Sequence, residues 1–142
     1  LFRSSSLQRD QKILKLTSEN KTTYPRAYPH LPFVLSDHEP EGGGYSFLID
    51  LEKPLEQKFE ICLNKALGAW VDTVLNGGYV AFPMDPGRCY VEPDEKEVTA
   101  YENKVEWAIF KLQADQASLD GLINLFIAFH TRCQKIMHID IS

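Results

Sequence analysis

Two long segments of this sequence place their apolar residues at the three- and four-residue spacing of an amphipathic helix. The first covers residues 54–75, with Pro54 suited to a first helical position, and the second starts at Ser118 as its N-cap. Segments with the two-residue period of strands stand before, between and after them. This change of period is the strongest constraint on the fold, because each helix must bury its apolar stripe against another layer.

The expected strands are short and apolar, and most are bounded by turn residues. They are residues 45–51, 79–84, 88–92, 97–101, 104–112 and 136–141. In the last of them Met137, Ile139 and Ile141 are expected on one face, with His138 and Asp140 on the other. The order predicts an α+β two-layer sandwich, a split βαβ, ferredoxin-like variant with a mostly antiparallel sheet of about five strands and two amphipathic helices.

Asn76-Gly77-Gly78 predicts where the first helix ends, because glycine readily adopts the left-handed conformation of a C-cap. Upstream of the strands, residues 22–44 contain four prolines and end in three glycines, which predicts an extended loop. We therefore expect residues 1–44 to form a basic, Pro/Gly-rich N-terminal segment that wraps a single α+β body formed by residues 45–142.

Charge is unevenly distributed along the 142 residues. The whole chain has a net charge of -5. Residues 1–35 hold six basic and two acidic residues, a net of +4, whereas residues 36–142 hold nine basic and eighteen acidic residues, a net of -9. An acidic body repels nucleic-acid phosphates, so we expect no nucleic-acid partner. No run of 18 apolar residues occurs, which argues against a membrane-spanning helix and a membrane partner.

The acidic residues are densest where hairpin turns are expected. The six in question are Glu92, Asp94, Glu95, Glu97, Glu102 and Glu106. One interpretation is a solvated rim that prevents the sheet edge from aggregating. The other is a docking surface for a basic protein partner, since complementary charge accelerates association and sharpens specificity. If strand alternation extends to Glu102, it shares a face with Glu106.

Two other groups of residues have catalytic or ligand-binding chemistry. Residues 37–41 hold four acid-base or metal-ligating side chains, and Cys89 with His130 could form a thiolate–imidazole pair. Neither has a recognised spacing, so we expect no metal and no cofactor. The three cysteines form no zinc or redox motif and are expected to be free thiols in the reducing cytoplasm.

The leading hypothesis is a non-enzymatic protein-binding module whose acidic surface engages a basic protein. An inhibitor or immunity protein that neutralises a nuclease-type toxin has this general charge profile. The alternative is a small enzyme or a metal- or ligand-binding protein, with its site near residues 37–41 or at Cys89 and His130. A third hypothesis is a homo-oligomer paired through the last strand, residues 136–141.

Overall fold

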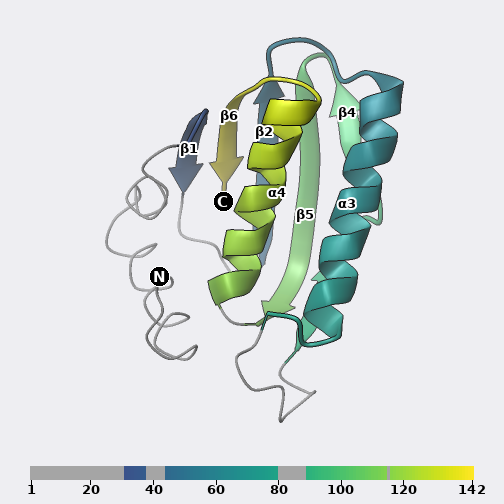
Figure 1. Ribbon diagram of the computed structural model, residues 1–142, viewed down its shortest axis with the longest axis vertical. Coiled ribbons are helices and arrows are strands. Elements are labelled where there is room, and N and C mark those ends of the chain that lie inside the picture. The colour runs from purple at the N-terminus through teal and green to yellow at the C-terminus, as the bar shows by residue number, and fades with distance from the viewer. Residues whose placement is uncertain (1–30, 38–43, 80–88, 115) are drawn as a thin grey trace.

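The computed structural model describes residues 31–37, 44–79, 89–114 and 116–142 (Figure 1). In chain order, the helices and strands are β1 (Val34–Asp37), β2 (Tyr45–Leu51), α3 (Gln57–Leu75), β3 (Tyr90–Pro93), β4 (Thr99–Tyr101), β5 (Lys104–Gln113), α4 (Gln116–Arg132) and β6 (Ile136–Ile141). Apart from Tyr79, the strand expected at residues 79–84 lies outside the described residues.

The strands form one sheet in the order β1-β6-β2-β5-β3, and the short β4 also pairs with β5. Neighbouring strands are antiparallel except β1 and β6, which are parallel. Both helices cover the same face of the sheet (Figure 1). The predicted α+β two-layer sandwich is thus confirmed, and the order from β2 to β6 is that of a split βαβ fold.

The central strand β2 decides which side chains enter the core. Phe47, Ile49 and Leu51 alternate toward the helices and are at most 2% exposed. Ser46, Leu48 and Asp50 alternate with them and point to the opposite face. Since β2 pairs with β5 on one side and β6 on the other, its alternation aligns the buried and open faces of all three strands.

The two helices are joined to each other and to the sheet through two tryptophans. The Trp70 indole Nε1 on α3 donates a hydrogen bond of 2.8 Å to the Ser118 carbonyl on α4. The Trp70 ring meets Trp107 of β5 edge to face, with 6.2 Å between the centroids. The expected N-cap role of Ser118 is wrong, because α4 begins at Gln116 and Ser118 is fully buried inside its first turn.

The end of α3 follows the sequence prediction. Gly77 has a φ of 76°, the left-handed conformation that glycine adopts without a steric penalty. Its N–H donates to the Val74 carbonyl, and the N–H of Gly78 donates to the Thr73 carbonyl at 2.8 Å. These two bonds form a Schellman motif, which confirms the predicted C-cap.

The start of α3 differs from the prediction, because the helix begins at Gln57 and not at Pro54. The side chain of Glu56 makes no capping hydrogen bond. Instead the buried Gln134 amide holds this segment from a distant part of the chain. Its Oε1 accepts a bond of 2.8 Å from the Glu56 N–H, and its Nε2 donates a bond of 3.0 Å to the Pro54 carbonyl.

β1 lies within residues 22–44, which were expected to form an extended loop. Its four residues pair in parallel with β6, and Leu35 faces Ile139 in the core. β6 therefore has a partner on each side, β1 and β2. Neither edge of β6 is available for another copy of the chain. The hypothesis of a homo-oligomer paired through residues 136–141 is therefore wrong. Residues 1–30 and 38–43 of the expected N-terminal segment lie outside the described residues.

The faces of β6 also need one correction. Ile139 and Ile141 are buried as expected, but Met137 is 49% exposed and Ile136 is 1% exposed. The cause is a shift of register against β2, where Asp50 pairs with His138 and Leu51 with Ile136. Such a bulge interrupts the alternation, so Ile136 takes the core position expected for Met137.

We predict that Gln134→Ala destabilises the protein by about 1–3 kcal/mol, because the partly buried Glu56 N–H and Pro54 carbonyl then lose their partner. Urea unfolding followed by far-UV circular dichroism measures this change. Gln113→Ala, at an exposed position on β5, is the matched control and should stay within about 0.5 kcal/mol of wild type. Equal destabilisation by the two variants would contradict the role given to Gln134.

Candidate functional site

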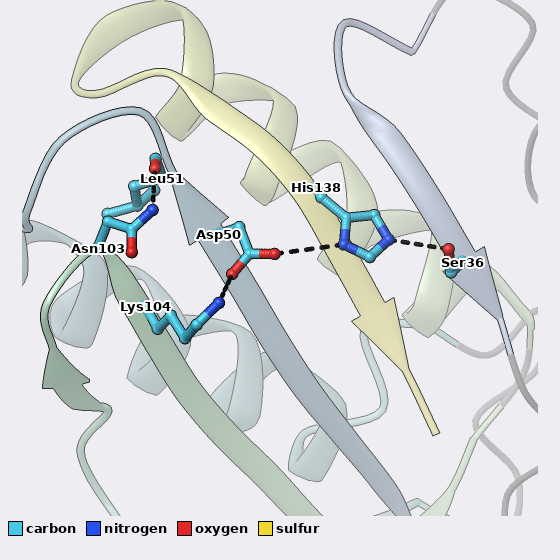
Figure 2. Close-up of polar contacts among 6 residues, drawn as sticks. All are labelled: Ser36, Asp50, Leu51, Asn103, Lys104 and His138. Atoms are coloured by element: carbon cyan, nitrogen blue, oxygen red, sulfur yellow. Dashed lines mark hydrogen bonds and ion pairs between the residues drawn. The ribbon is translucent and has the colours of Figure 1, made fainter.

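The sheet face opposite α3 and α4 carries a mixture of polar and exposed apolar side chains. We call it the open face, since no helix of the described part covers it (Figures 1 and 2). By strand alternation and pairing, its residues are Val34, Ser36, Ser46, Leu48, Asp50, Tyr90, Glu92, Thr99, Tyr101, Lys104, Glu106, Ala108, Phe110, Lys111, Gln113, His138 and Asp140.

Four polar side chains form a continuous row across the open face, and Figure 2 shows them. Ser36 Oγ lies 2.8 Å from His138 Nε2. His138 Nδ1 lies 3.4 Å from Asp50 Oδ2, and Asp50 Oδ1 accepts a bond of 2.6 Å from Lys104 Nζ. We call these four residues the polar row. Each comes from a different strand, in the order β1, β6, β2 and β5.

The strand register explains why the polar row forms. Asp50 lies directly opposite His138 on β6 and directly opposite Lys104 on β5. Cross-strand partners in an antiparallel pair have Cβ atoms close enough for polar side chains to bond. Ser36 reaches His138 diagonally, because the direct partner of His138 on β1 is Val34.

Asp50 is the electrostatic centre of the polar row. The hydrogen bond from Lys104 lowers the pKa of the Asp50 carboxyl below its usual value of 3.8, burial opposes this, and the His138 hydrogen bond adds to the lowering. The same bond to Asp50 raises the pKa of Lys104. Asp50 is therefore ionised at neutral pH, with its two oxygens divided between Lys104 and His138.

The imidazole of His138 has a carboxylate at Nδ1 and a hydroxyl at Nε2. In the tautomer that carries its proton on Nδ1, the ring donates to Asp50 and accepts from the Ser36 hydroxyl. This is the arrangement in which an imidazole can remove a proton from a serine. The side chains of Asp50 and His138 are 27% and 31% exposed, so solvent reaches the row.

The prediction that His138 lies on the polar face of the last strand is confirmed. No sequence pattern predicts the polar row as a group. Ser36 lies in a segment expected to be a loop, and its contact with His138 spans 102 residues. Asp50 has a visible signal, since it interrupts the apolar side chains of strand 45–51, but only the sheet order shows which residues it meets.

The six acidic residues predicted as a partner-binding surface lie along the β3–β4 side of the sheet. Glu92 is on β3, Glu106 is on β5, and Glu102 is in the β4–β5 turn; Asp94, Glu95 and Glu97 are in the β3–β4 connection. All six are exposed. We call this surface the acidic edge. Glu102 has a φ of 53° in its turn, so strand alternation does not extend to it.

The backbone of the acidic edge is held in place by bonds to the body. The N–H of Asp94 donates to the Ala108 carbonyl, and the Trp107 indole donates to the Glu95 carbonyl at 3.2 Å. The Asn64 side chain on α3 accepts a bond of 2.9 Å from the Val98 N–H. The connection that carries three of the carboxylates is therefore anchored at several points.

The turn at Glu102 is anchored next to the polar row, as Figure 2 shows. The Asn103 side-chain amide donates a bond of 3.0 Å to the Leu51 carbonyl. In return, the Leu51 N–H donates to the Asn103 carbonyl at 2.8 Å. These reciprocal bonds hold the β4–β5 turn against the end of β2.

Exposed aromatic side chains lie beside the acidic edge on the open face. Tyr90, Tyr101 and Phe110 are 37%, 43% and 65% exposed. The Tyr90 hydroxyl donates a bond of 2.6 Å to Glu92, which raises the pKa of Tyr90. The ammonium group of Lys111 lies 5.9 Å from the centre of the Tyr90 ring, within the range of a cation–π contact.

Cys89 and His130 are not brought together. Cys89 directly precedes β3, and Tyr90 pairs with Gln113 at the end of the sheet where α4 begins. His130 lies near the other end of α4, about 21 Å from Gln116 along the helix axis at 1.5 Å per residue. Its Nδ1 accepts a bond of 2.9 Å from the Ile136 N–H, so His130 stabilises the connection between α4 and β6.

Of residues 37–41, only Asp37 lies within the described part of the chain. It ends β1 and is buried, with an exposed fraction of 2%. His38, Glu39 and Glu41 lie outside the described residues. Within the described ranges, no three His, Cys, Asp or Glu side chains are grouped so that they could hold a metal ion.

No protein-family model, no curated protein and no solved structure matches this chain. None of the helices in the described ranges has the length and apolar character needed to cross a membrane.

The lowered pKa of Asp50 predicts how its contribution to stability depends on pH. The stabilisation is fully present above the unfolded-state pKa, near 3.8, and is lost as the pH falls through the lower folded-state pKa. We expect Lys104→Gln to destabilise the protein only slightly at pH 5, because the pair is partly exposed and screened by solvent. At pH 2, where more of the Asp50 carboxyl is protonated, the difference from wild type should be smaller.

Urea unfolding at the two pH values measures this difference, and the carboxyl carbon shift of Asp50 in an NMR titration reports its pKa directly. Lys65→Gln, at an exposed position on α3, is the control and should show no such dependence on pH. An unchanged Asp50 titration in Lys104→Gln would refute the pairing as the cause.

Proposed function

We propose that this chain is a protein-binding module whose acidic edge engages a basic protein partner. The observation that carries the proposal is the exposure of all six carboxylates on one side of the sheet. In the sequence, the positive charge of Lys104 lies among these carboxylates and partly cancels their charge. In the structure, Lys104 is already paired with Asp50. A basic partner therefore meets an edge with most of its negative charge available.

The anchored backbone supports the same proposal. The connection between β3 and β4 is bonded to Ala108, Trp107 and Asn64, so its carboxylates need little further ordering when a partner binds. Ordering of loops and side chains is a main cost of association. A pre-organised acidic surface gains more affinity from the same charges than a loose one does.

The aromatic side chains beside the acidic edge indicate the chemistry of the partner. Tyrosine and phenylalanine supply contact area at interfaces, and their ring faces attract lysine and arginine. Lys111 already lies over the Tyr90 ring, while Glu92 binds the hydroxyl of that ring. An arginine-rich surface suits this combination, because a guanidinium group stacks on a ring and also pairs with a carboxylate.

Such a partner has the surface of a nucleic-acid-binding protein. A protein that covers that surface with carboxylates competes with phosphate groups for the same arginines and lysines. We therefore include in the proposal an inhibitor role, with an immunity protein against a nuclease-type toxin as one form, and a place of action in the cytoplasm. The acidic edge itself repels nucleic acid.

Charge reversal at the acidic edge tests the proposal. The basic protein is first captured from a lysate of the source cell on the immobilised chain and then purified for stopped-flow measurements. We expect Glu95→Lys/Glu97→Lys to slow its association about tenfold or more at low salt, because steering by opposite charge is reduced. The difference should shrink at high salt, where the Debye length is short.

Glu56→Lys/Asp72→Lys is the matched control. It changes the net charge by the same amount at two exposed positions, the N-cap and the C-terminal part of α3, neither of which belongs to the acidic edge. Its association rate should stay within about twofold of wild type, since steering depends on where the charges lie as well as on their sum. Equal slowing by the two double variants would leave only a net-charge effect and would overturn the role of the acidic edge.

A further inference from the structure

We propose that Ser36, His138 and Asp50 form a nucleophilic site for acyl transfer on the open face, with a small carboxylic ester as substrate. This inference does not rest on the acidic edge, which lies on the other side of the sheet from β1. It rests on three side chains from adjacent strands bonded in the order hydroxyl, imidazole, carboxylate.

The first requirement is a base in contact with the nucleophile. Ser36 Oγ lies 2.8 Å from His138 Nε2, within the 2.6–3.2 Å range needed for direct proton transfer. Nε2 is also the correct nitrogen, because the carboxylate occupies Nδ1. The separation of 3.4 Å between Nδ1 and Asp50 is longer, as is common in unliganded sites whose bonds tighten when substrate binds.

The second requirement is a third group that orients the base. Asp50 lies directly opposite His138 in the β2–β6 register, and Lys104 holds its other oxygen at 2.6 Å. The Lys104 bond fixes the carboxylate group so that Oδ2 faces the imidazole ring. Asp50 and Lys104 are thus positioning residues, whereas Ser36 and His138 are the groups that touch the substrate.

The third requirement is access for the substrate. Ser36 lies on the edge strand β1, and His138 is 31% exposed, so an ester reaches both from solvent. Val34, directly opposite His138, is 63% exposed, and Met137, next to His138, is 49% exposed. The apolar side chain of Val34 beside His138 favours a short apolar acyl group.

The developing oxyanion needs hydrogen-bond donors. Among the described strands β1 pairs only with β6, and an edge strand has backbone N–H groups that point away from its partner. We assign these N–H groups as the donors to the oxyanion.

The chemical steps balance with water as the only co-reactant. Ser36 Oγ attacks the ester carbonyl carbon as its proton passes to His138 Nε2. The C–O bond to the alcohol then breaks, and the alcohol leaves with that proton, which leaves an acyl group on Ser36. Water attacks the acyl carbon and gives its proton to Nε2. The acid is released as Ser36 Oγ recovers the proton from the imidazole.

A fluorophosphonate probe tests the site without knowledge of the natural ester. Its phosphorus forms a bond to Ser36 Oγ, fluoride leaves, and the serine proton is released through His138. We expect the folded wild type to be labelled at Ser36, located by peptide mass spectrometry, and to hydrolyse p-nitrophenyl acetate. Ser36→Ala should abolish the labelling, and His138→Gln and Asp50→Asn should slow it at least tenfold.

Ser46→Ala is the matched control, an exposed serine on the same face of β2 that should leave labelling unchanged. The His138 Nδ1–H signal in ¹⁵N NMR should weaken in Asp50→Asn, which separates positioning from a general structural effect. Because a variant can fail to fold, wild type unfolded in urea is labelled in parallel and should not react. Labelling of folded wild type no faster than that of Ser36→Ala would overturn the proposal.

Discussion

The pairing of β2 with β5 on one side and β6 on the other is the constraint on which the structure depends. It places Phe47, Ile49 and Leu51 under the helices at the same time as it places Asp50 between His138 and Lys104. A slip of one residue would expose the apolar set and bury the carboxylate. The hydrophobic free energy that holds the core together therefore also keeps the polar row in register.

Local patterns explain which parts of the fold could be predicted. Strands 45–51 and 136–141 have their predicted bounds, since alternation and turn residues are both local signals. The end of α3 also follows, because Gly77 takes the left-handed conformation. The start of α3 does not follow, since the segment before it is held by Gln134, which lies 80 residues from Pro54 along the chain.

Local sequence patterns likewise predict one candidate site and not the other. The acidic edge can be predicted from the sequence because its carboxylates are close neighbours along the chain. The anchoring of their backbone by Asn64 and Trp107 cannot be predicted in this way. The polar row is invisible there, since its members come from four strands and the β6 bulge decides which way His138 and Met137 point. Chemistry built from cross-strand contacts requires the sheet order, which no local pattern contains.

The contact between Ser36 and His138 closes a loop of 102 residues. Closing a loop of this length costs conformational entropy, and β1 and β6 offset this cost only when they pack together. A growing polypeptide on the ribosome has no such contact until residue 138 has left the exit tunnel. The hydroxyl–imidazole pair thus exists only in a chain whose first and last described strands have joined.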